Sequence, residues 1–196
     1  MIDDRCLDTL FRDARSQNGW RDEPVPDALL ETIYDLMKFG PTSANSSPAR
    51  FLFLRSQAAK ERLRPHLSAA NVDKVMTAPV TAIIGFDLHF YEHLPRLFPH
   101  NLAARGWFAA PGKEAHAYTT AMRNGSLQAG YFILAARAVG LDCGPMSGFD
   151  IDGVDREFWR GTHVRTNFLC ALGHGDPAKV YPRNPRLAFE EACTLL

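Results

Sequence analysis

The segment 118–139 constrains the fold of this chain more than any other. Leu127, Tyr131 and Leu134 recur at steps of four and three residues, and Gly140 then permits the left-handed turn that commonly ends a helix. Toward its end the segment is apolar nearly all round. We therefore expect a central helix that other elements bury on most sides, and a chain of 196 residues is long enough to supply them.

Other periodic patterns predict the remaining helices. An amphipathic helix is expected over residues 4–15, with Arg15 at its C-terminal edge. A second begins after Pro26 and Asp27 and stops at Gly40. Two further helices are expected over residues 58–67 and 71–77.

Short apolar runs predict buried strands at residues 51–54, 80–86 and 167–173. Residues 87–116 show no clear period, and the prolines after Gly173 indicate an extended tail. Helices and strands interleave without internal repeats or a low-complexity linker, so the chain is expected to form one α+β domain over residues 1–196.

The charge balance argues against two classes of partner. The chain carries 22 basic and 22 acidic residues, which gives no electrostatic footprint for nucleic acid or an anionic membrane. The acidic N-terminus does not resemble a signal peptide, and no apolar run approaches the roughly 18 residues of a membrane span. The four cysteines are widely spaced, which favours reduced thiols. We expect a cytoplasmic protein.

Several catalytic motifs are absent or weak. No dinucleotide-binding GxGxxG, phosphate loop or GxSxG elbow occurs. HFYEH at residues 89–93 matches a zinc-peptidase pattern, but Pro95 and Pro99 argue against a helix that could present both histidines. A triad built from scattered Ser, His and Asp is no better supported. We expect no metal.

The segment GPTSANSSPARF, residues 40–51, is more informative. A helix stop is followed by small and amide residues, and then by Pro48 before a strand. Such a loop is dense in hydrogen-bond donors and acceptors, which favours a binding loop over a plain polar turn if other segments support it.

This loop resembles that of the nitroreductase superfamily, with Ser47 and Ala49 standing where Gln and Trp are usual. The resemblance implies an FMN enzyme with a central, mostly antiparallel sheet flanked by helices. It also implies an intertwined homodimer, in which the loop reaches the flavin held mainly by the partner subunit. The matching residues are Pro41, Thr42, Ser43, Asn45 and Pro48.

Two further segments resemble flavin-binding motifs of that family. Arg15 corresponds to the first phosphate-binding arginine, and Gln17 and Asn18 follow it where a second cation is usual. Asn71 and Lys74 resemble the Asn-x-x-Lys that meets the pyrimidine edge of the flavin. The resemblance implies that the amide reads the ring and that the cation stabilises the reduced anion. The alternative for Lys74 is a solvated helix end.

The last two segments complete the implied site. Pro145, Met146, Ser147 and Gly148 resemble the family's Pro-x-x-Gly-Phe-Asp, whose backbone N–H groups face flavin N5. In the C-terminal stretch, Arg186 and, more weakly, Arg183 resemble the basic motif that binds the phosphate. Taken alone, the segment that begins at Pro145 could simply be a turn after a helix.

The implied mechanism is ping-pong hydride transfer through flavin N5, with NADPH or NADH as donor and no side chain assigned as general base. The whole-length pattern is closest to the malonic semialdehyde reductase branch of pyrimidine utilisation, which reduces 3-oxopropanoate to 3-hydroxypropanoate. A broad nitroaromatic or quinone reductase and a non-catalytic flavin-binding protein are the alternatives. The candidate cations for the substrate carboxylate are Arg50, Arg96, Arg105 and Lys113.

Overall fold

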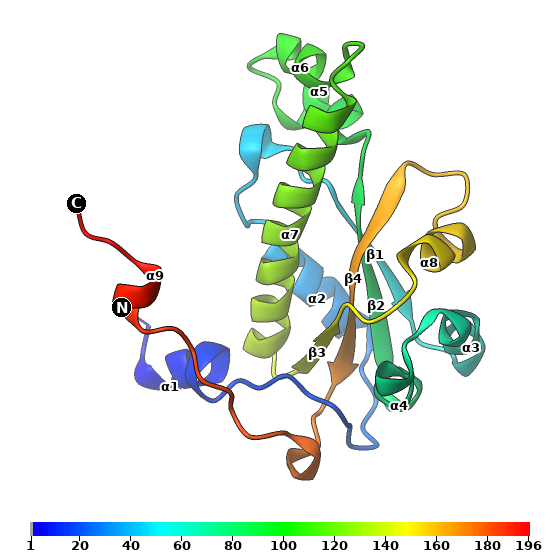
Figure 1. The fold of residues 1–196 in the computed structure, drawn as a ribbon, viewed down its shortest axis with the longest axis vertical. Helices are drawn as coiled ribbons and strands as arrows, with labels where there is room; N and C mark the ends of the chain where they lie inside the picture. Colours follow the sequence, from blue (N-terminus) through cyan, green and yellow to red (C-terminus); the bar gives the residue numbers. More distant parts are fainter. Residues whose placement is uncertain (1) are drawn as a thin grey trace.

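A four-stranded sheet lies at the centre of the computed structural model, which describes residues 2–196 (Figure 1). Its strands stand in the order β1-β2-β4-β3, and every neighbouring pair is antiparallel. The predicted α+β class and antiparallel sheet are therefore confirmed. The strands are β1 (Ala49–Leu54), β2 (Val80–Asp87), β3 (Asp142–Met146) and β4 (Val164–Gly173).

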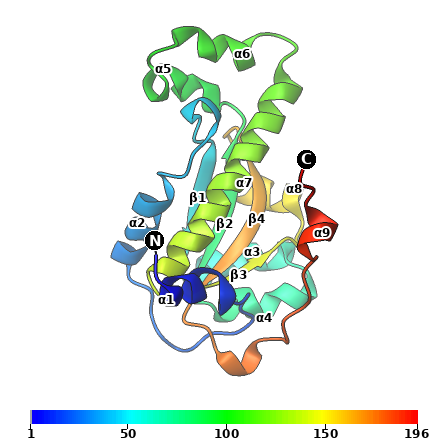
Figure 2. The same ribbon diagram turned by 90° about the vertical axis from the view of Figure 1, so that its left-hand side faces the viewer.

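Helices cover both faces of this sheet (Figures 1 and 2). One face carries α7 (Glu114–Ala138) and α2 (Asp27–Met37). The other carries α3 (Gln57–Leu63), its extension η3 (Arg64–His66), α4 (Ala69–Thr77) and α8 (Ile151–Phe158).

The strand β2 shows why both faces must be covered. Its side chains alternate, so that Val80, Ala82 and Ile84 pack against α2 and α7 while Ile83 packs against the opposite layer. All four are fully buried. A strand that is buried on both faces is stable only between two layers of other elements. Such a strand consists mostly of apolar residues, which is why this one could be recognised from the sequence.

The predicted long helix is confirmed as α7, which starts four residues earlier than its pattern indicated. The prediction that it is buried on most sides is wrong for this chain, because one face is exposed and carries Tyr118, Met122, Leu127 and Tyr131 at 41–48% exposure. Its upper part supports a cluster of short helical turns built around Phe86, Phe90 and Phe108. These turns span much of the region 87–116, and each is too short to show a period. They are η4 (Phe90–His93), α5 (Leu94–Leu97), η5 (Leu102–Arg105) and α6 (Gly106–Ala109).

The predicted N-terminal helix ends early. It comprises α1 (Asp4–Leu7) and the π-helical turn η1 (Asp8–Arg12), so Arg15 lies in extended chain and not at a helix edge. The chain leaves the helix because Ser16 forms a bridge with Cys143 of β3, where the Gln17 N–H donates to the Cys143 carbonyl at 2.9 Å.

The elements β3 and α8 were missed from the sequence. Gly144 and Pro145 interrupt the apolar pattern of β3, and an edge strand tolerates such a proline because one of its sides lacks a sheet partner. The strands β1 and β4 also begin two and three residues before their apolar runs.

The chain after Gly173 is largely irregular, as expected, with short turns at η6 (Pro177–Lys179) and α9 (Phe189–Ala192). No helix among residues 2–196 is long and apolar enough to cross a membrane.

Candidate functional site

Three segments meet beside β3 and form what we call the cradle, which consists of Gln17, Asn71, Lys74, Gly144 and Gly148. A Cβ atom on Gly144 would lie 2.6 Å from the Gln17 carbonyl oxygen and 3.1 Å from Lys74 Cδ. The Asn71 amide nitrogen donates to the Gly148 carbonyl at 2.9 Å. The structure thus brings together four predicted site residues, with Gly144 as an addition.

One polar atom of the cradle lacks a partner. Gln17 is only 6% exposed, and its Oε1 atom makes no hydrogen bond within residues 2–196. A buried, unsatisfied oxygen costs about 1–3 kcal/mol. The side-chain amide of Gln17 lies against Gly175, whereas its backbone carbonyl lies beside Gly144.

Lys74 contributes a partly buried cation. Burial lowers the pKa of its ammonium group below the ordinary value. No carboxylate forms an ion pair with it in the described part of the chain. Because desolvation without a counter-charge is unfavourable, an anion placed at this position would be bound favourably.

The segment 145–148 presents backbone rather than side chains. Pro145 and Met146 end β3, and the Met146 side chain is buried in the core. The Gly148 carbonyl accepts from Asn71 and from the Ser68 N–H, whereas the Gly148 N–H has no acceptor among residues 2–196. This arrangement leaves a backbone donor next to Asn71.

The predicted phosphate residues are brought together in part. The Arg183 guanidinium donates to the carbonyls of Arg12 at 2.6 Å and Ala14 at 3.2 Å, and the Arg15 guanidinium donates to the Tyr181 carbonyl. The C-terminal stretch therefore crosses the N-terminal segment close to Arg15. Arg186 lies further along this stretch, exposed, and donates only to the nearby carbonyls of Asn184 and Pro185.

A second group is formed by the loop of residues 41–48, which contains the 3₁₀ turn η2 (Ser43–Asn45). Three of its residues, Ala44, Asn45 and Ser47, have φ of 51°, 49° and 42°. L-residues rarely adopt this left-handed conformation, and each instance carries strain that the surroundings must support.

Two buried amides of α7 provide that support. Asn124 Oδ1 accepts from the Ser43 N–H at 2.8 Å, and Gln128 Oε1 accepts from the Ala49 N–H at 2.9 Å. Both side chains are at most 5% exposed. Sequence reasoning missed them, although an amide pair spaced by four residues on a buried helix was a visible signal.

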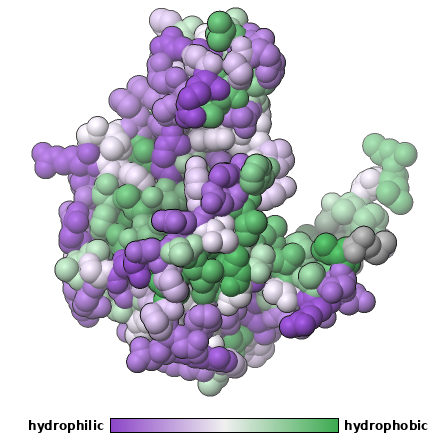
Figure 3. Space-filling model, turned by 180° about the vertical axis from the view of Figure 1, so that it is seen from behind, coloured by the Kyte–Doolittle hydropathy of each residue, from purple (hydrophilic) through white to green (hydrophobic). Residues whose placement is uncertain are grey.

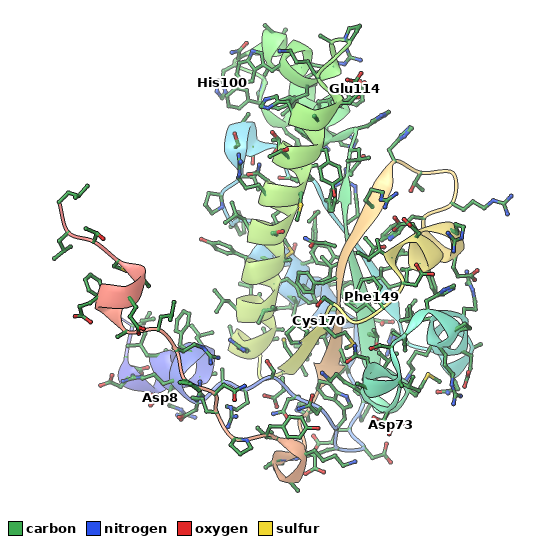
Figure 4. All side chains as sticks on the ribbon, in the orientation of Figure 1. Asp8, Asp73, His100, Glu114, Phe149 and Cys170 are labelled. Carbon is green, nitrogen blue, oxygen red and sulfur yellow. The ribbon has the colours of Figure 1, made fainter. Side chains whose placement is uncertain are left out.

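The two groups lie apart within one chain. The loop of residues 41–48 sits beside the upper part of α7, whereas α4, which carries Asn71 and Lys74, lies beyond the sheet at the other end (Figures 1 and 2). Figure 4 labels Asp73 and Phe149 near the cradle, and His100 and Glu114 at the opposite end. The predicted site residues therefore do not form a single site in one protomer.

Two hollows flank the loop. A groove of about 1170 Å³ runs between α2, β1 and α5, and its lining includes Leu30, Tyr34, Phe51, Phe53 and Arg96. A pocket of about 520 Å³ lies between the loop, α6 and α7. The HFYEH residues form a 3₁₀ turn, and no cluster of His, Cys, Asp or Glu that could hold a metal is present in residues 2–196.

Comparisons with known proteins agree with this geometry. The Nitroreductase family model matches residues 12–174. A Ralstonia pickettii protein with the provisional name NADH dehydrogenase/NAD(P)H nitroreductase HadB is 64% identical over 189 residues, covering 96% of each chain. A Cupriavidus pinatubonensis protein with the same provisional enzyme name is 59% identical over 195 residues, covering 100% of both.

Two solved structures share the fold. A provisionally named nitroreductase, ydfN, from Bacillus subtilis superposes with a TM-score of 0.87 at 22% identity, covering 97% of this chain and 98% of that one. Another, from Exiguobacterium sibiricum and in complex with FMN, has a TM-score of 0.85 at 19% identity, covering 100% and 98%.

Proposed function

The chain belongs to the nitroreductase family, and from that membership we propose that it is an FMN-dependent NAD(P)H oxidoreductase acting as a homodimer. The observation that carries the proposal is the cradle, where the Gln17 main chain and the partly buried, unpaired Lys74 side chain both approach Gly144. FMN, when bound, supplies two-electron hydride transfer between a reduced nicotinamide and the substrate.

The residues of the cradle fit the polar edge of a flavin. Gly148 offers an unused N–H donor. Asn71 is held by its bond to Gly148, so its remaining amide oxygen is fixed in place. Lys74 holds a positive charge where the flavin ring becomes anionic on reduction, which favours the reduced state.

The arginines fit the phosphate. Arg15 and Arg183 lie in adjacent segments, and Arg186 follows on the same C-terminal stretch. Guanidinium groups bind phosphate through paired, charge-assisted hydrogen bonds, and a dianion is matched by more than one cation. We assign Asn18, beside Gln17, to the same end of the site.

The free edge of the sheet supports the homodimer. β1 is an edge strand, and the groove beside it exposes apolar side chains such as Phe51 and Phe53. The C-terminal stretch projects away from the body, and its tip is hydrophobic (Figures 1 and 3). Leu187 and Leu195 on it are 69% and 85% exposed. Burying these surfaces in a second copy would be favourable.

A homodimer also unites the separated groups. In the proposed assembly, the loop of residues 41–48 from one protomer completes the site at the cradle of the other. Pro41, Thr42, Ser43 and Asn45 then contact the flavin from the second side.

For the substrate, we propose malonic semialdehyde, reduced to 3-hydroxypropanoate. The names of the relatives favour a second candidate, a nitroaromatic or quinone reductase. The measurement that separates them is kcat/KM for malonic semialdehyde against that for a quinone. A strong preference for the quinone would exclude the aldehyde assignment.

The cofactor and the dimer are tested together by the absorption spectrum and the solution mass of the purified protein. We expect a yellow protein of twice the 21.9 kDa chain mass that NADPH or NADH bleaches under anaerobic conditions. Yellow protein that neither nicotinamide bleaches would favour a non-catalytic flavin-binding protein. Colourless protein that rejects added FMN would overturn the proposal.

A further inference from the structure

The pocket between the loop, α6 and α7 has one continuous helical wall. His116, Thr120, Arg123 and Leu127 all line it. They recur at steps of four, three and four, which places them on one face of α7. The opposite wall is the segment from Pro41 to Ser43, which the proposed function assigns to the flavin contact.

The lining is mostly flat and apolar. Phe108 stacks on the His116 ring with centroids 5.0 Å apart and planes within 11°, and Trp107 is 45% exposed beside it. A volume of about 520 Å³ suits a small molecule, and aromatic side chains suit a planar one.

Arg123 is the cation of this pocket. It makes neither an ion pair nor a side-chain hydrogen bond with any of residues 2–196. Arg123 immediately precedes Asn124, whose side-chain amide oxygen accepts a hydrogen bond from the Ser43 N–H. A free guanidinium on a rigid helix, next to the loop, is well placed to bind an anion.

The four cations considered from the sequence are less suitable. Arg50 is paired with Asp87 at 2.7 Å, and Arg105 is paired with Glu92 through bonds of 2.8 and 2.7 Å. Arg96 lines the other groove. Lys113 precedes α7 and lines neither hollow.

We propose that this pocket receives the oxidised substrate and that Arg123 binds a carboxylate on it, so that the enzyme prefers small anionic acceptors over neutral ones. The inference rests on the proposed function, because it places the pocket next to the flavin. Arg123 determines specificity and takes no part in hydride transfer.

A matched pair of acceptors tests this proposal in the FMN-loaded enzyme. Para-nitrobenzoate and para-nitrobenzamide carry the same reducible group and differ in charge. We expect Arg123→Met to lower kcat/KM for the benzoate about 10- to 100-fold, mainly through KM, because a hydrogen bond to a charged group is lost. The benzamide value should change less than about twofold, and Arg123→Lys should restore part of the benzoate activity.

Arg160→Met is the control, because Arg160 is exposed and lines neither hollow. Equal losses for both acceptors, or a change only in the KM for NADPH, would overturn the role of Arg123. Since NADPH also carries anionic phosphates, its KM is measured in every variant. Wild-type protein that binds FMN but reduces neither these acceptors nor malonic semialdehyde would instead contradict the proposed function.

Discussion

The cradle and the loop of residues 41–48 differ in how their polar groups are satisfied. In the cradle, Gln17 Oε1 has no partner and Lys74 has no counter-charge within residues 2–196. The N–H groups of Ser43 in the loop and of Ala49 just after it are matched by buried amides of α7, although the buried Ser46 hydroxyl has no partner among residues 2–196. The loop also has three residues in the strained left-handed backbone conformation.

This difference suggests a division of roles. A region with an unpaired cation gains stability when an anionic ligand binds, whereas a strained loop held by a buried helix keeps its shape without one. We therefore expect the cradle to determine cofactor affinity and the loop to act as a preformed wall. Substitutions in the two regions should separate these effects.

Gly144→Ala should have the largest effect, because the new Cβ would lie 2.6 Å from the Gln17 carbonyl, a backbone atom that cannot rotate away. We expect a loss of about 1–3 kcal/mol in the free energy of unfolding, together with weaker FMN binding. Denaturant unfolding and FMN titration measure the two. Gly130→Ala, on α7 with open space around the glycine, is the matched control.

Lys74→Met should separate affinity from stability. Removing the cation should weaken binding of reduced FMN by about 1.5–3 kcal/mol, since an interaction with a charged group is lost. The protein without FMN should become no less stable, because the desolvation of an unpaired ammonium is also removed. The flavin midpoint potential and the thermal unfolding of the FMN-free protein test this, and a loss of stability with no change in potential would contradict it.

The pH dependence of the same group has a defined sign. Burial lowers the pKa of Lys74, so its charge is present below that lowered pKa and is lost as pH rises through it. The stabilisation of reduced FMN should therefore fall at a pH below the ordinary lysine range of about 10.4. Midpoint potentials recorded against pH should show this step in the wild type, and Lys74→Met should lack it.

Asn124→Ala should affect the loop of residues 41–48 and leave cofactor affinity at the cradle nearly unchanged. It leaves the Ser43 N–H without its partner and removes the side-chain bond to the Thr120 carbonyl, at a cost of about 1–2 kcal/mol in the free energy of unfolding. Oxidised FMN should bind almost as before at the cradle, while turnover falls because one wall of the site has moved. Thr119→Ala serves as the control, because Thr119 is exposed on the same helix and its hydroxyl donates only to the Ala115 carbonyl one turn earlier.

Arg186→Ala should have the smallest effect of the set. Its side chain is exposed and donates only to neighbouring carbonyls, so solvent screens its charge. We expect FMN affinity to fall by about 1 kcal/mol with no change in unfolding. An unchanged dissociation constant would remove Arg186 from the phosphate site.

The elements that could be predicted are those whose own residues show an apolar run or a helical repeat. Residues 80–86 form a mostly apolar run that contains one polar residue, Thr81, and the central helix repeats its apolar side chains until Gly140. The edge strand β3 gave no such signal, because Gly144 and Pro145 interrupt it. The cradle was predictable in its residue types, since Asn71 and Lys74 lie three residues apart on one helix face.

The sequence by itself therefore indicated three of the four strands, the long helix and the residues proposed to meet a flavin, because periodicity and motif spacing are local properties. Only the tertiary structure decided which polar groups remain available. It paired Arg50 with Asp87 and Arg105 with Glu92, left Gln17 Oε1 unmatched, and used Asn124 and Gln128 to hold the loop. Most of these pairings join residues distant in the chain, and their energies depend on burial that no local pattern encodes.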